Sequence, residues 1–493
     1  MVASEPLDSL TAALHRQDRL LPGYDPAAFF CDLTSQLDTS PAAAQICQRL
    51  TEFDVASLRR RAKLADQELF NLGITFTVYS DRNAIDRVLP FDVIPRILTA
   101  ADWTTISKGV EQRVAAINAF LGDIYTKGQI FKDGVVPEAL VKRNPNYRKE
   151  MEGFVPPKGT YVHICGTDII RDDDGEFLVL EDNARTPSGV SYVLENRHLM
   201  MRAFPDLAEN IAIADVDEYG RRLSDALAEV APDGVSDPTV VVLTPGIYNS
   251  AYFEHVFLAR EMGVLLVEGR DLVVENDRVF MRTIAGLEPV HVIYRRIDDD
   301  FLDPLAFRED SALGVPGLFG AYRKGNVTLA NAVGTGASDD KAIYAYMPRI
   351  IRYYLGEDAI LRNVETHICS EADGLAHTLD HLEELVVKPV GGSGGYGVVV
   401  GPHASKKTLR DLRRQLVADP GNFISQPTIS LSVVPTLTRQ GIEPRHVDLR
   451  PFAVTGKSTW VLPGGLTRVA LKKGSLVVNS SQGGGSKDTW VLI

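Results

Sequence analysis

Residues 166–183, with the sequence GTDIIRDDDGEFLVLEDN, predict a β-hairpin that carries oxygen-rich side chains on one face. Apolar and polar residues alternate on both sides of a turn at residues 172–175, as in two antiparallel strands. A turn centred there places Asp168 opposite Glu181, and Asn183 lies two residues further along the same face. Mg²⁺ prefers hard oxygen ligands, so two carboxylates and an amide oxygen in this arrangement indicate a metal site.

A plain structural interpretation competes with the metal site. Asp172, Asp173 and Asp174 fit the turn itself, where short polar side chains bond to nearby backbone groups. For these three residues we favour a role in the turn. For the strand residues, a solvent-facing hairpin whose acidic side chains only improve solubility stays open beside metal binding.

A second stretch, residues 386–400 with the sequence VVKPVGGSGGYGVVV, predicts a strand, a flexible glycine-rich loop and another strand. Glycine has no Cβ, so the backbone N–H groups of such a loop can approach phosphate oxygens closely. Lys388, at the end of the first strand, would add a positive charge. The candidate phosphate-binding residues of the loop are Gly391, Gly392, Ser393, Gly394 and Gly395.

Three other glycine-rich motifs explain this loop less well. Residues 392–397 match G-x-G-x-x-G and residues 391–395 match G-x-S-x-G, but both motifs require a helix next, and a strand is predicted instead. The phosphate-loop motif G-x-x-x-x-G-K-[ST] does not occur here. A flap that covers phosphates fits best, and an ordinary glycine-rich hairpin is the structural alternative.

Composition restricts the class of protein. The chain of 493 residues is too long to fold around one ordinary hydrophobic core, and its length corresponds to roughly two to four domains. The chain has 52 Lys and Arg against 65 Asp and Glu, a net charge of −13, which argues against binding to nucleic acid or an anionic membrane. The four cysteines lack metal-binding spacing, the start of the chain does not read as a signal peptide, and no apolar run reaches membrane-spanning length. We therefore expect a cytoplasmic protein.

The remaining sequence indicates several structural regions. Residues 104–129 carry apolar side chains at helical spacing, and we expect mainly helices in residues 1–150. Prolines between residues 137 and 157 mark a boundary. Residues 238–267 alternate strand, helix and strand, which indicates a small parallel sheet. The final part of the chain is predicted to be rich in strands.

The two motif-bearing stretches together resemble an ATP-grasp site. The segment GTDIIRDDDGEFLVLEDNARTPSG resembles the metal-binding part of ATP-grasp ligases such as D-alanine–D-alanine ligase and glutathione synthetase. The segment VVKPVGGSGGYGV resembles their lysine-bearing strand and flap. In those ligases the nucleotide-binding half comes first, whereas here the metal-binding half does. The order resembles the circularly permuted ATP-grasp family, specifically its type 2 bacterial branch, a group similar to glutathionylspermidine synthetase.

This resemblance implies the fold and the domain organisation. The expected fold is a circularly permuted ATP-grasp fold of mixed α+β and α/β class, with a small Rossmann-like domain and a helical N-terminal region. The four expected parts are a mainly helical region (1–150), the metal-binding part of the ATP-grasp domain (151–235), a small α/β pre-ATP-grasp domain (236–335) and the nucleotide-binding part of the ATP-grasp domain (336–493).

The resemblance also implies roles for residues outside the two stretches. Lys341, in SDDKAIYAYMP, matches a second ATP lysine, and Lys341 and Lys388 would contact the phosphates. Gln426, in NFISQPTIS, lies where the adenine hinge is expected, although Pro427 stands where an acidic residue is usual. Arg450 and Arg468, in HVDLRPFAV and GLTRVAL, are the expected catalytic residues, because arginine can stabilise a transferred phosphoryl group with two parallel bonds.

The implied function is an ATP-dependent carboxylate–amine ligase that forms an amide through an acyl phosphate. ATP and Mg²⁺, as one or two ions, are the implied cofactors, with Asp168, Glu181 and Asn183 as metal ligands. The implied partners are small-molecule or peptide carboxylate and amine substrates, with no nucleic acid and no membrane, and a homo-oligomer is one option. An ATP-dependent phosphotransferase and an inactive ATP-grasp scaffold are the alternatives.

Two further segments are candidates for substrate contacts. The segment from Arg185 to Gly189 follows the metal-binding strand and either lines a substrate pocket or forms a plain turn. Arg295 and Arg296 end a predicted strand, where they either bind a substrate carboxylate or are charged residues at a strand end.

Overall fold

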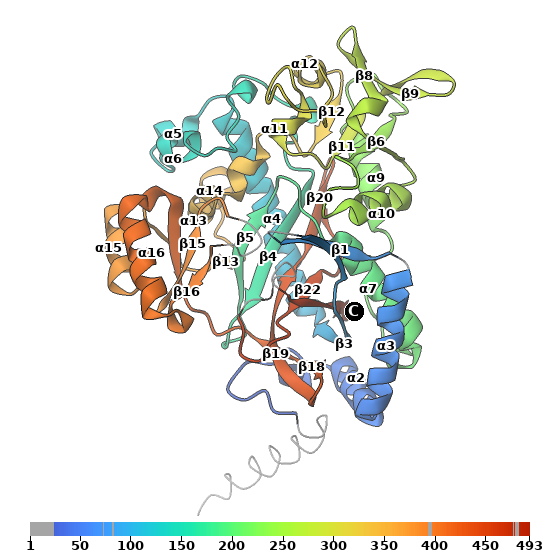
Figure 1. Ribbon diagram of the computed structural model, residues 1–493, viewed down its shortest axis with the longest axis vertical. Helices are drawn as coiled ribbons and strands as arrows, with labels where there is room; N and C mark the ends of the chain where they lie inside the picture. Colours follow the sequence, from blue (N-terminus) through green and yellow to red (C-terminus); the bar gives the residue numbers. More distant parts are fainter. Residues whose placement is uncertain (1–23, 72, 81–82, 393–396, 477, 479–482) are drawn as a thin grey trace, which may run out of the picture.

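The computed structural model describes residues 24–493, with gaps at 72, 81–82, 393–396, 477 and 479–482. Figure 1 shows a large central sheet, a smaller sheet with two helices beside it, and a separate α/β unit at the opposite upper side. Segments from both ends of the chain enter the central sheet. The mixed helix and sheet architecture agrees with the predicted fold class.

The central sheet has ten strands. Its main path is β13–β5–β4–β19–β22–β23–β3, and β18, β20 and β21 attach to this path. The strands are β3 (Phe91–Leu98), β4 (Ile164–Arg171), β5 (Phe177–Asn183), β13 (Arg362–Asn363), β18 (Val433–Thr438), β19 (Gly441–Arg450), β20 (Phe452–Thr455), β21 (Thr459–Val461), β22 (Leu466–Val469) and β23 (Gly485–Val491). β4 pairs with β19, so the predicted metal hairpin and the strand that ends at Arg450 are neighbours.

The N-terminal region supplies helices and also strands. Its elements are α2 (Pro41–Glu52), α3 (Val55–Asn71), β1 (Thr75–Ser80), β2 (Asn83–Val88), β3, α4 (Ala100–Ile124), α5 (Gln129–Lys132) and α6 (Glu138–Lys142). β3 pairs in parallel with β23 at the edge of the central sheet. The sequence interpretation did not include these strands. Pro95 within β3 obscures the pattern, because proline lacks the N–H that a strand uses in its ladder.

Helix α4 is the longest helix and forms much of the principal core. Thr99 and Asp102 form a capping box at its start, which satisfies backbone N–H groups that have no partner within the helix. Its apolar side chains recur at helical spacing and are buried, as predicted: Ile106, Val110, Val114, Ile117, Phe120, Leu121 and Ile124. The helix packs against α14 (Met347–Leu355) and against β21 of the central sheet.

A four-stranded sheet with the order β14–β17–β15–β16 forms the smaller body at the left of Figure 1. Its elements are β14 (His367–Ile368), α15 (Ala372–Asp380), β15 (Leu385–Pro389), β16 (Val399–Val400), α16 (Lys406–Ala418) and β17 (Phe423–Pro427). Cys369, Val387, Leu412, Leu416 and Phe423 form its small core. Helix α13 (Lys341–Ala345) and α14 connect this body to the centre.

The α/β unit at the upper right of Figure 1 contains a parallel sheet with the order β12–β11–β6–β7. The predicted strand, helix and strand in residues 238–267 are therefore confirmed. The α-helices and β-strands between β5 and α13 are α7 (Val190–Ala203), α8 (Pro205–Ala208), α9 (Tyr219–Glu229), β6 (Val240–Leu243), α10 (Tyr252–Met262), β7 (Leu265–Val267), β8 (Leu272–Glu275), β9 (Arg278–Thr283), β10 (Gly286–Val290), β11 (Val292–Arg295), α11 (Asp299–Leu302), α12 (Leu318–Arg323) and β12 (Thr328–Ala330).

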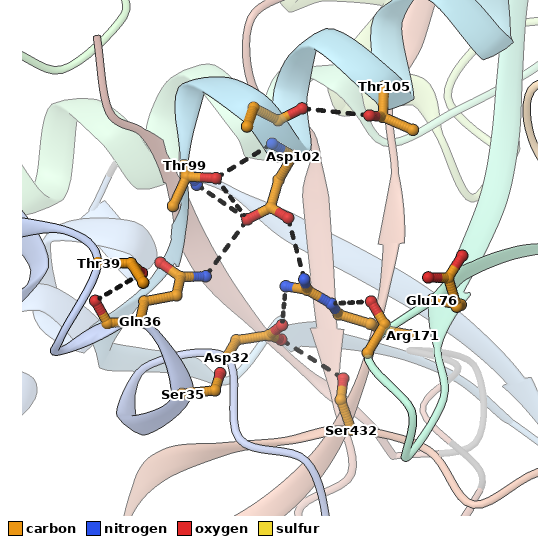
Figure 2. Close-up of polar contacts among 12 residues, drawn as sticks. Asp32, Ser35, Gln36, Thr39, Thr99, Asp102, Thr105, Arg171, Glu176 and Ser432 are labelled. Carbon is orange, nitrogen blue, oxygen red and sulfur yellow. Dashed lines mark hydrogen bonds and ion pairs between the residues drawn. The ribbon is translucent and has the colours of Figure 1, made fainter.

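A buried ion network fixes the end of β4 to the N-terminal region. Asp32 is fully buried and accepts hydrogen bonds from Arg96 of β3 and Arg171 of β4. Arg171 also donates to Asp102, which belongs to the capping box of α4, at 3.0 Å (Figure 2). Because Arg171 ends the strand that carries Asp168, this network helps to hold that strand in position.

Candidate functional site: a charged cleft beside the β4–β5 hairpin

The hairpin has the predicted register. Asp168 is directly opposite Glu181 in the antiparallel pair of β4 and β5, which confirms the prediction from the sequence. Asp172 accepts hydrogen bonds from the backbone N–H groups of Asp174 and Glu176, so it serves the turn, as we expected. The intervening Asp182 points to the other face, where Arg113 of α4 pairs with it at 2.5 Å. Alternation along β5 therefore separates cleft residues from core residues.

Two arginines bind the carboxylate of Asp168. Arg450 donates from Nε at 2.5 Å and from Nη2 at 2.8 Å, and Arg468 donates from Nη2 at 2.6 Å. Burial alone would raise the pKa of Asp168, but these two guanidinium groups hold it well below its usual range. Arg468 also pairs with Asp448, so the predicted catalytic arginines belong to one buried network.

Glu181 and Asn183 offer the least committed oxygen atoms at the site. Glu181 lies 3.2 Å from Lys341 Nζ and 4.0 Å from Arg450 Nη2. The amide N–H of Asn183 donates to the Gly166 carbonyl at 3.3 Å, which leaves its oxygen for another partner. A carboxylate and an amide oxygen on one strand face fit the ligand preferences of Mg²⁺.

The described residues contain no group of three or more His, Cys, Asp or Glu side chains placed to hold a metal ion. A metal ion at this site would therefore depend on Asn183 beside the carboxylates. Asp168 fits this role less directly than Glu181, because both of its oxygens already accept arginine hydrogen bonds. The three predicted ligands do line one cavity.

The two predicted ATP lysines both line the cavity near the base of the flap. Lys388 donates to Gln426 Oε1 at 2.6 Å, and Gln426 Nε2 donates to Thr366 at 2.9 Å. Burial lowers the pKa of Lys388 to about 8, against the opposing effect of nearby Glu181. Lys341 donates to the Gly392 carbonyl at 2.6 Å. Gln426 thus positions a lysine, and its amide is bonded at both ends within the protein.

The predicted strand–loop–strand arrangement around the glycine-rich segment is present. β15 and β16 pair antiparallel, and β16 is shorter than the predicted strand. Gly392 and Lys388 line the same cavity, and Gly391 lines a second cavity that adjoins it. The other predicted loop residues, Ser393, Gly394 and Gly395, lie outside the described residues.

One cavity of about 560 Å³ joins these groups. Its polar end contains the hairpin carboxylates, both lysines and both arginines. Its apolar end is lined by Ile170, Leu180, Val386, Val400, Ile429 and Leu431. A cavity with an apolar part and convergent cations can take an aromatic base at one end and phosphates at the other.

Other sequence candidates have structural partners. Arg295 donates to the carbonyl groups of Asn331 and Ala332, and it pairs with Asp299. Arg296 donates to Pro187, Ser188 and Glu254. Both arginines therefore hold groups of the protein itself in place, and neither lines the cavity; the buried Nε of Arg296 has no partner among the described residues.

The sequence interpretation missed Asp448, which lines the cavity and pairs with Arg468. Its signal was present, because Asp448 is two residues before Arg450 in β19 and so lies on the same strand face.

Comparison with known proteins identifies the class. A model of the circularly permuted ATP-grasp type 2 family matches residues 95–470. The glutathione synthetase-like effector GSS30 from Globodera pallida has a similar structure, with a TM-score of 0.58 over 89% of this chain and 98% of that chain, at 12% sequence identity. The chain therefore belongs to the circularly permuted ATP-grasp type 2 family, and the ATP-dependent ligases are its coarse functional class.

Several relatives are similar over nearly the whole chain. An uncharacterized protein of Synechocystis sp. is 52% identical over 474 residues, which cover 96% of this chain and 98% of the relative. An uncharacterized protein of Mycobacterium tuberculosis is 49% identical over 483 residues, with 97% and 87% covered. A putative glutamate–cysteine ligase 2-2 of Frankia casuarinae is 42% identical over 475 residues, which are 96% of this chain but only 55% of that protein.

The described part of the chain has no helix with the length and apolar character needed to span a membrane.

Proposed function

We propose that the protein is an ATP- and Mg²⁺-dependent carboxylate–amine ligase that forms an amide or peptide-like bond. The observation that carries this proposal is the charge arrangement at one end of the cavity. Four cations, Lys341, Lys388, Arg450 and Arg468, face oxygen ligands from the β4–β5 hairpin, and an apolar space adjoins them. This arrangement suits a nucleoside triphosphate whose terminal phosphate lies near the hairpin.

The proposed reaction has two steps. A substrate carboxylate oxygen attacks the γ-phosphorus of ATP, so the bond to the β-phosphate oxygen breaks and an acyl phosphate and ADP form. An amine nitrogen then attacks the acyl carbon, phosphate leaves, and the amine loses a proton to give the amide. The protein mainly aligns the reactants and stabilises developing negative charge.

Each cation has a distinct task in this proposal. Lys341 and Lys388 hold the phosphates from two sides, and Gln426 fixes the direction of Lys388. Arg450 and Arg468 stabilise the transferred phosphoryl group. Asp168 keeps both guanidinium groups in place before the substrates bind. Arginine suits this role because its planar group stays charged and can make two parallel bonds to oxygen.

Mg²⁺, when bound, would neutralise phosphate charge and orient the phosphate oxygens. Glu181 and Asn183 would hold it, with Asp168 as a further ligand if an arginine bond is exchanged. The requirement follows from the donor set, because carboxylate and amide oxygens match this ion.

The domain division is also part of the proposal. We propose that residues 151–235 and 336–493 form the metal-binding and nucleotide-binding parts of one ATP-grasp domain, with residues 236–335 as a pre-ATP-grasp domain and residues 1–150 as an N-terminal region. The pairing of β4 with β19 across these parts supports it. The Frankia relative is named a putative ligase, but that name describes the whole Frankia protein. This chain matches 55% of that protein, so the name is limited support for ligase chemistry here.

The direct test of the reaction is trapping of the acyl phosphate. The protein is incubated with Mg²⁺, ATP, hydroxylamine and a panel of carboxylic acids, and hydroxamate and ADP are both measured. A ligase gives hydroxamate in step with ADP for at least one acid. Stable phosphorylated product without hydroxamate would instead support a phosphotransferase and would overturn the proposal. Glu181→Gln is the matched inactive variant.

A further inference from the structure

A second cavity, of about 820 Å³, adjoins the nucleotide cavity. The two cavities share the lining residues Glu181, Asn183, Thr186, Lys341 and Gly392. These shared residues include Glu181 and Asn183, the proposed metal ligands of the hairpin, and Lys341, one of the two proposed ATP lysines. A group bound in the second cavity can therefore reach the proposed site of phosphoryl transfer.

One wall of this second cavity carries two arginines beside Asp339 and Asp340, whose carboxylates already accept hydrogen bonds from backbone N–H groups. Arg143, just after α6, lines it, and none of the described residues forms a hydrogen bond or an ion pair with its guanidinium group. Within the described part of the chain, the side chain of Arg185, just after β5, has only a 3.4 Å bond to Asn146 and a 3.6 Å ion pair with Asp298. Arg450 and Arg468 of the nucleotide cavity pair closely with buried carboxylates, at 2.5 to 2.6 Å, whereas these two arginines keep more donors available.

The position of Arg185 is specifically built. Asp339 accepts hydrogen bonds from the backbone N–H groups of Ala184 and Arg185, at 2.6 and 3.2 Å. A side chain at Gly336 would meet Arg185 Cδ and Asn146 Cβ at 3.0 Å. Gly336 does not have a left-handed backbone, so its value here is space: it lets the Arg185 side chain lie against the chain and face the cavity.

The other wall is acidic. Glu371 and Asp419 line it, from the segments before α15 and after α16. Glu371 accepts a hydrogen bond from the Tyr346 hydroxyl at 2.7 Å and keeps further acceptor capacity. In Figure 1, α13, which begins with Lys341, lies between α6 and the α15–α16 body, so the two walls belong to different parts of the molecule.

The lining defines the chemistry of an occupant. Two available guanidinium groups bind a carboxylate well, and two carboxylates bind an ammonium group. No aromatic side chain of the described residues lines this cavity, so it offers no stacking surface for a second base. A molecule that carries both a carboxylate and an ammonium group matches both walls.

We propose that the second cavity binds an amino acid or short peptide as a substrate. Its α-carboxylate lies on Arg143 and Arg185, its ammonium group faces Glu371 and Asp419, and a side-chain carboxylate or amine reacts at the residues that the two cavities share. This inference rests on the ligase function proposed above, and it adds the substrate class and the residues that select it.

A panel of matched compounds tests the substrate class. Mg²⁺- and ATP-dependent ADP release is measured with amino acids and dipeptides that carry a side-chain carboxylate or amine, and with their N-acetyl and C-amide forms. We expect at least one zwitterion to stimulate release, and blocking either end to lower kcat/KM by about 10-fold or more. Equal activity of the blocked forms, or stimulation by none of the zwitterions, overturns the inference.

Variants test the residues. Arg143→Gln is expected to raise the KM for the active zwitterion by about 10-fold with little change in kcat, because it removes a contact made equally before and during reaction. Glu371→Gln should raise the same KM. Arg270→Gln, a change at an arginine whose side chain is 80% exposed and lines neither cavity, is the matched control. An unchanged KM in both cavity variants contradicts the inference.

A labelling experiment gives a readout that does not depend on turnover. All four native cysteines are buried, so an Ala139→Cys variant presents one accessible thiol at the second cavity. The active zwitterion should slow labelling by a thiol reagent about 10-fold at saturation, and an unchanged labelling rate contradicts occupancy of this cavity.

Calorimetry with ATP separates the two proposals. Absence of ATP binding to the wild type removes the ligase function, whereas ATP binding with no response to any zwitterion removes only the substrate class.

Discussion

Asp168 and Glu181 face each other across the β4–β5 hairpin, yet their carboxylates have different partners. Asp168 accepts three arginine hydrogen bonds, whereas Glu181 lies 3.2 Å from Lys341 and 4.0 Å from Arg450. One carboxylate therefore orients cations, and the other keeps oxygens available for a metal ion. Two residues with the same chemistry and adjacent positions thus have separate tasks.

Glu181 faces the cleft and its neighbour Asp182 faces Arg113 in the core, which predicts unequal effects of substitution at these two positions. Glu181→Gln should lower Mg²⁺-dependent ATP turnover on the order of 100-fold or more, because a neutral amide holds the ion weakly. Its melting temperature should stay close to that of the wild type. Asp182→Asn should instead lower the melting temperature, because Arg113 is left in a buried site with a weaker partner. Activity and thermal unfolding of both variants check this.

The two arginines should also differ from each other. Arg450→Gln should reduce turnover by about 100-fold or more through loss of transition-state stabilisation. Arg468→Gln should reduce turnover and also stability, because Asp448 is 1% exposed and loses its only arginine side-chain partner among the described residues. Equal melting temperatures for the two variants would disprove this distinction.

The buried Asp32 network predicts a large contribution to stability far from the chemistry. Asp32→Asn should lower the free energy of unfolding by about 3 kcal/mol, because Arg96 and Arg171 lose a buried charged partner. Asp225→Asn, in a surface pair with Arg221, is the control and should cost under about 1 kcal/mol. Urea unfolding of the two variants measures both values.

His163 predicts how stability depends on pH. Burial lowers its pKa to about 3, and neither ring nitrogen has a partner among the described residues. The unfolded chain binds a proton at this histidine near its ordinary pKa of 6.5, and the folded chain does not. The folded state is therefore fully favoured above that value and loses stability as pH falls from 6.5 towards 3.

The matching experiment replaces His163 with an apolar ring of similar size. His163→Phe should remove about 2 kcal/mol of the loss in unfolding free energy between about pH 7 and about pH 5. Chemical denaturation at both pH values gives the difference. If the wild type and the variant lose the same amount of stability, His163 is not the group that titrates.

The hairpin site could be predicted from the sequence because its determinants are local. The strand period of two fixed which residues share a face, and the Asp172–Gly175 turn fixed the register that brings Asp168 opposite Glu181. Lys388 was predicted from the strand and glycine-rich loop pattern, whereas Lys341, Arg450 and Arg468 came from family resemblance, and the structure brings all four to one cavity.

Other features depend on contacts between distant segments and left no readable pattern. The direct bonds from Arg450 to Asp168 join residues that are 282 positions apart. Lys487 and Thr489 of β23 pair with Asp92 and Arg96 of β3, with an irregularity between them where Pro95 interrupts the ladder. Arg143, whose loop shows no motif, joins Arg185 only when the N-terminal region packs beside the hairpin.

ATP binding with and without Mg²⁺, measured by calorimetry, tests the central claim most directly. The wild type should bind ATP in a Mg²⁺-dependent manner, and Lys388→Ala should weaken binding by about 10-fold or more because a phosphate contact is lost. Lys407→Ala, at an exposed lysine of α16, should match the wild type. Absence of ATP binding to folded wild-type protein, or equal affinity in Lys388→Ala, would contradict the assignment of this cleft as the nucleotide site.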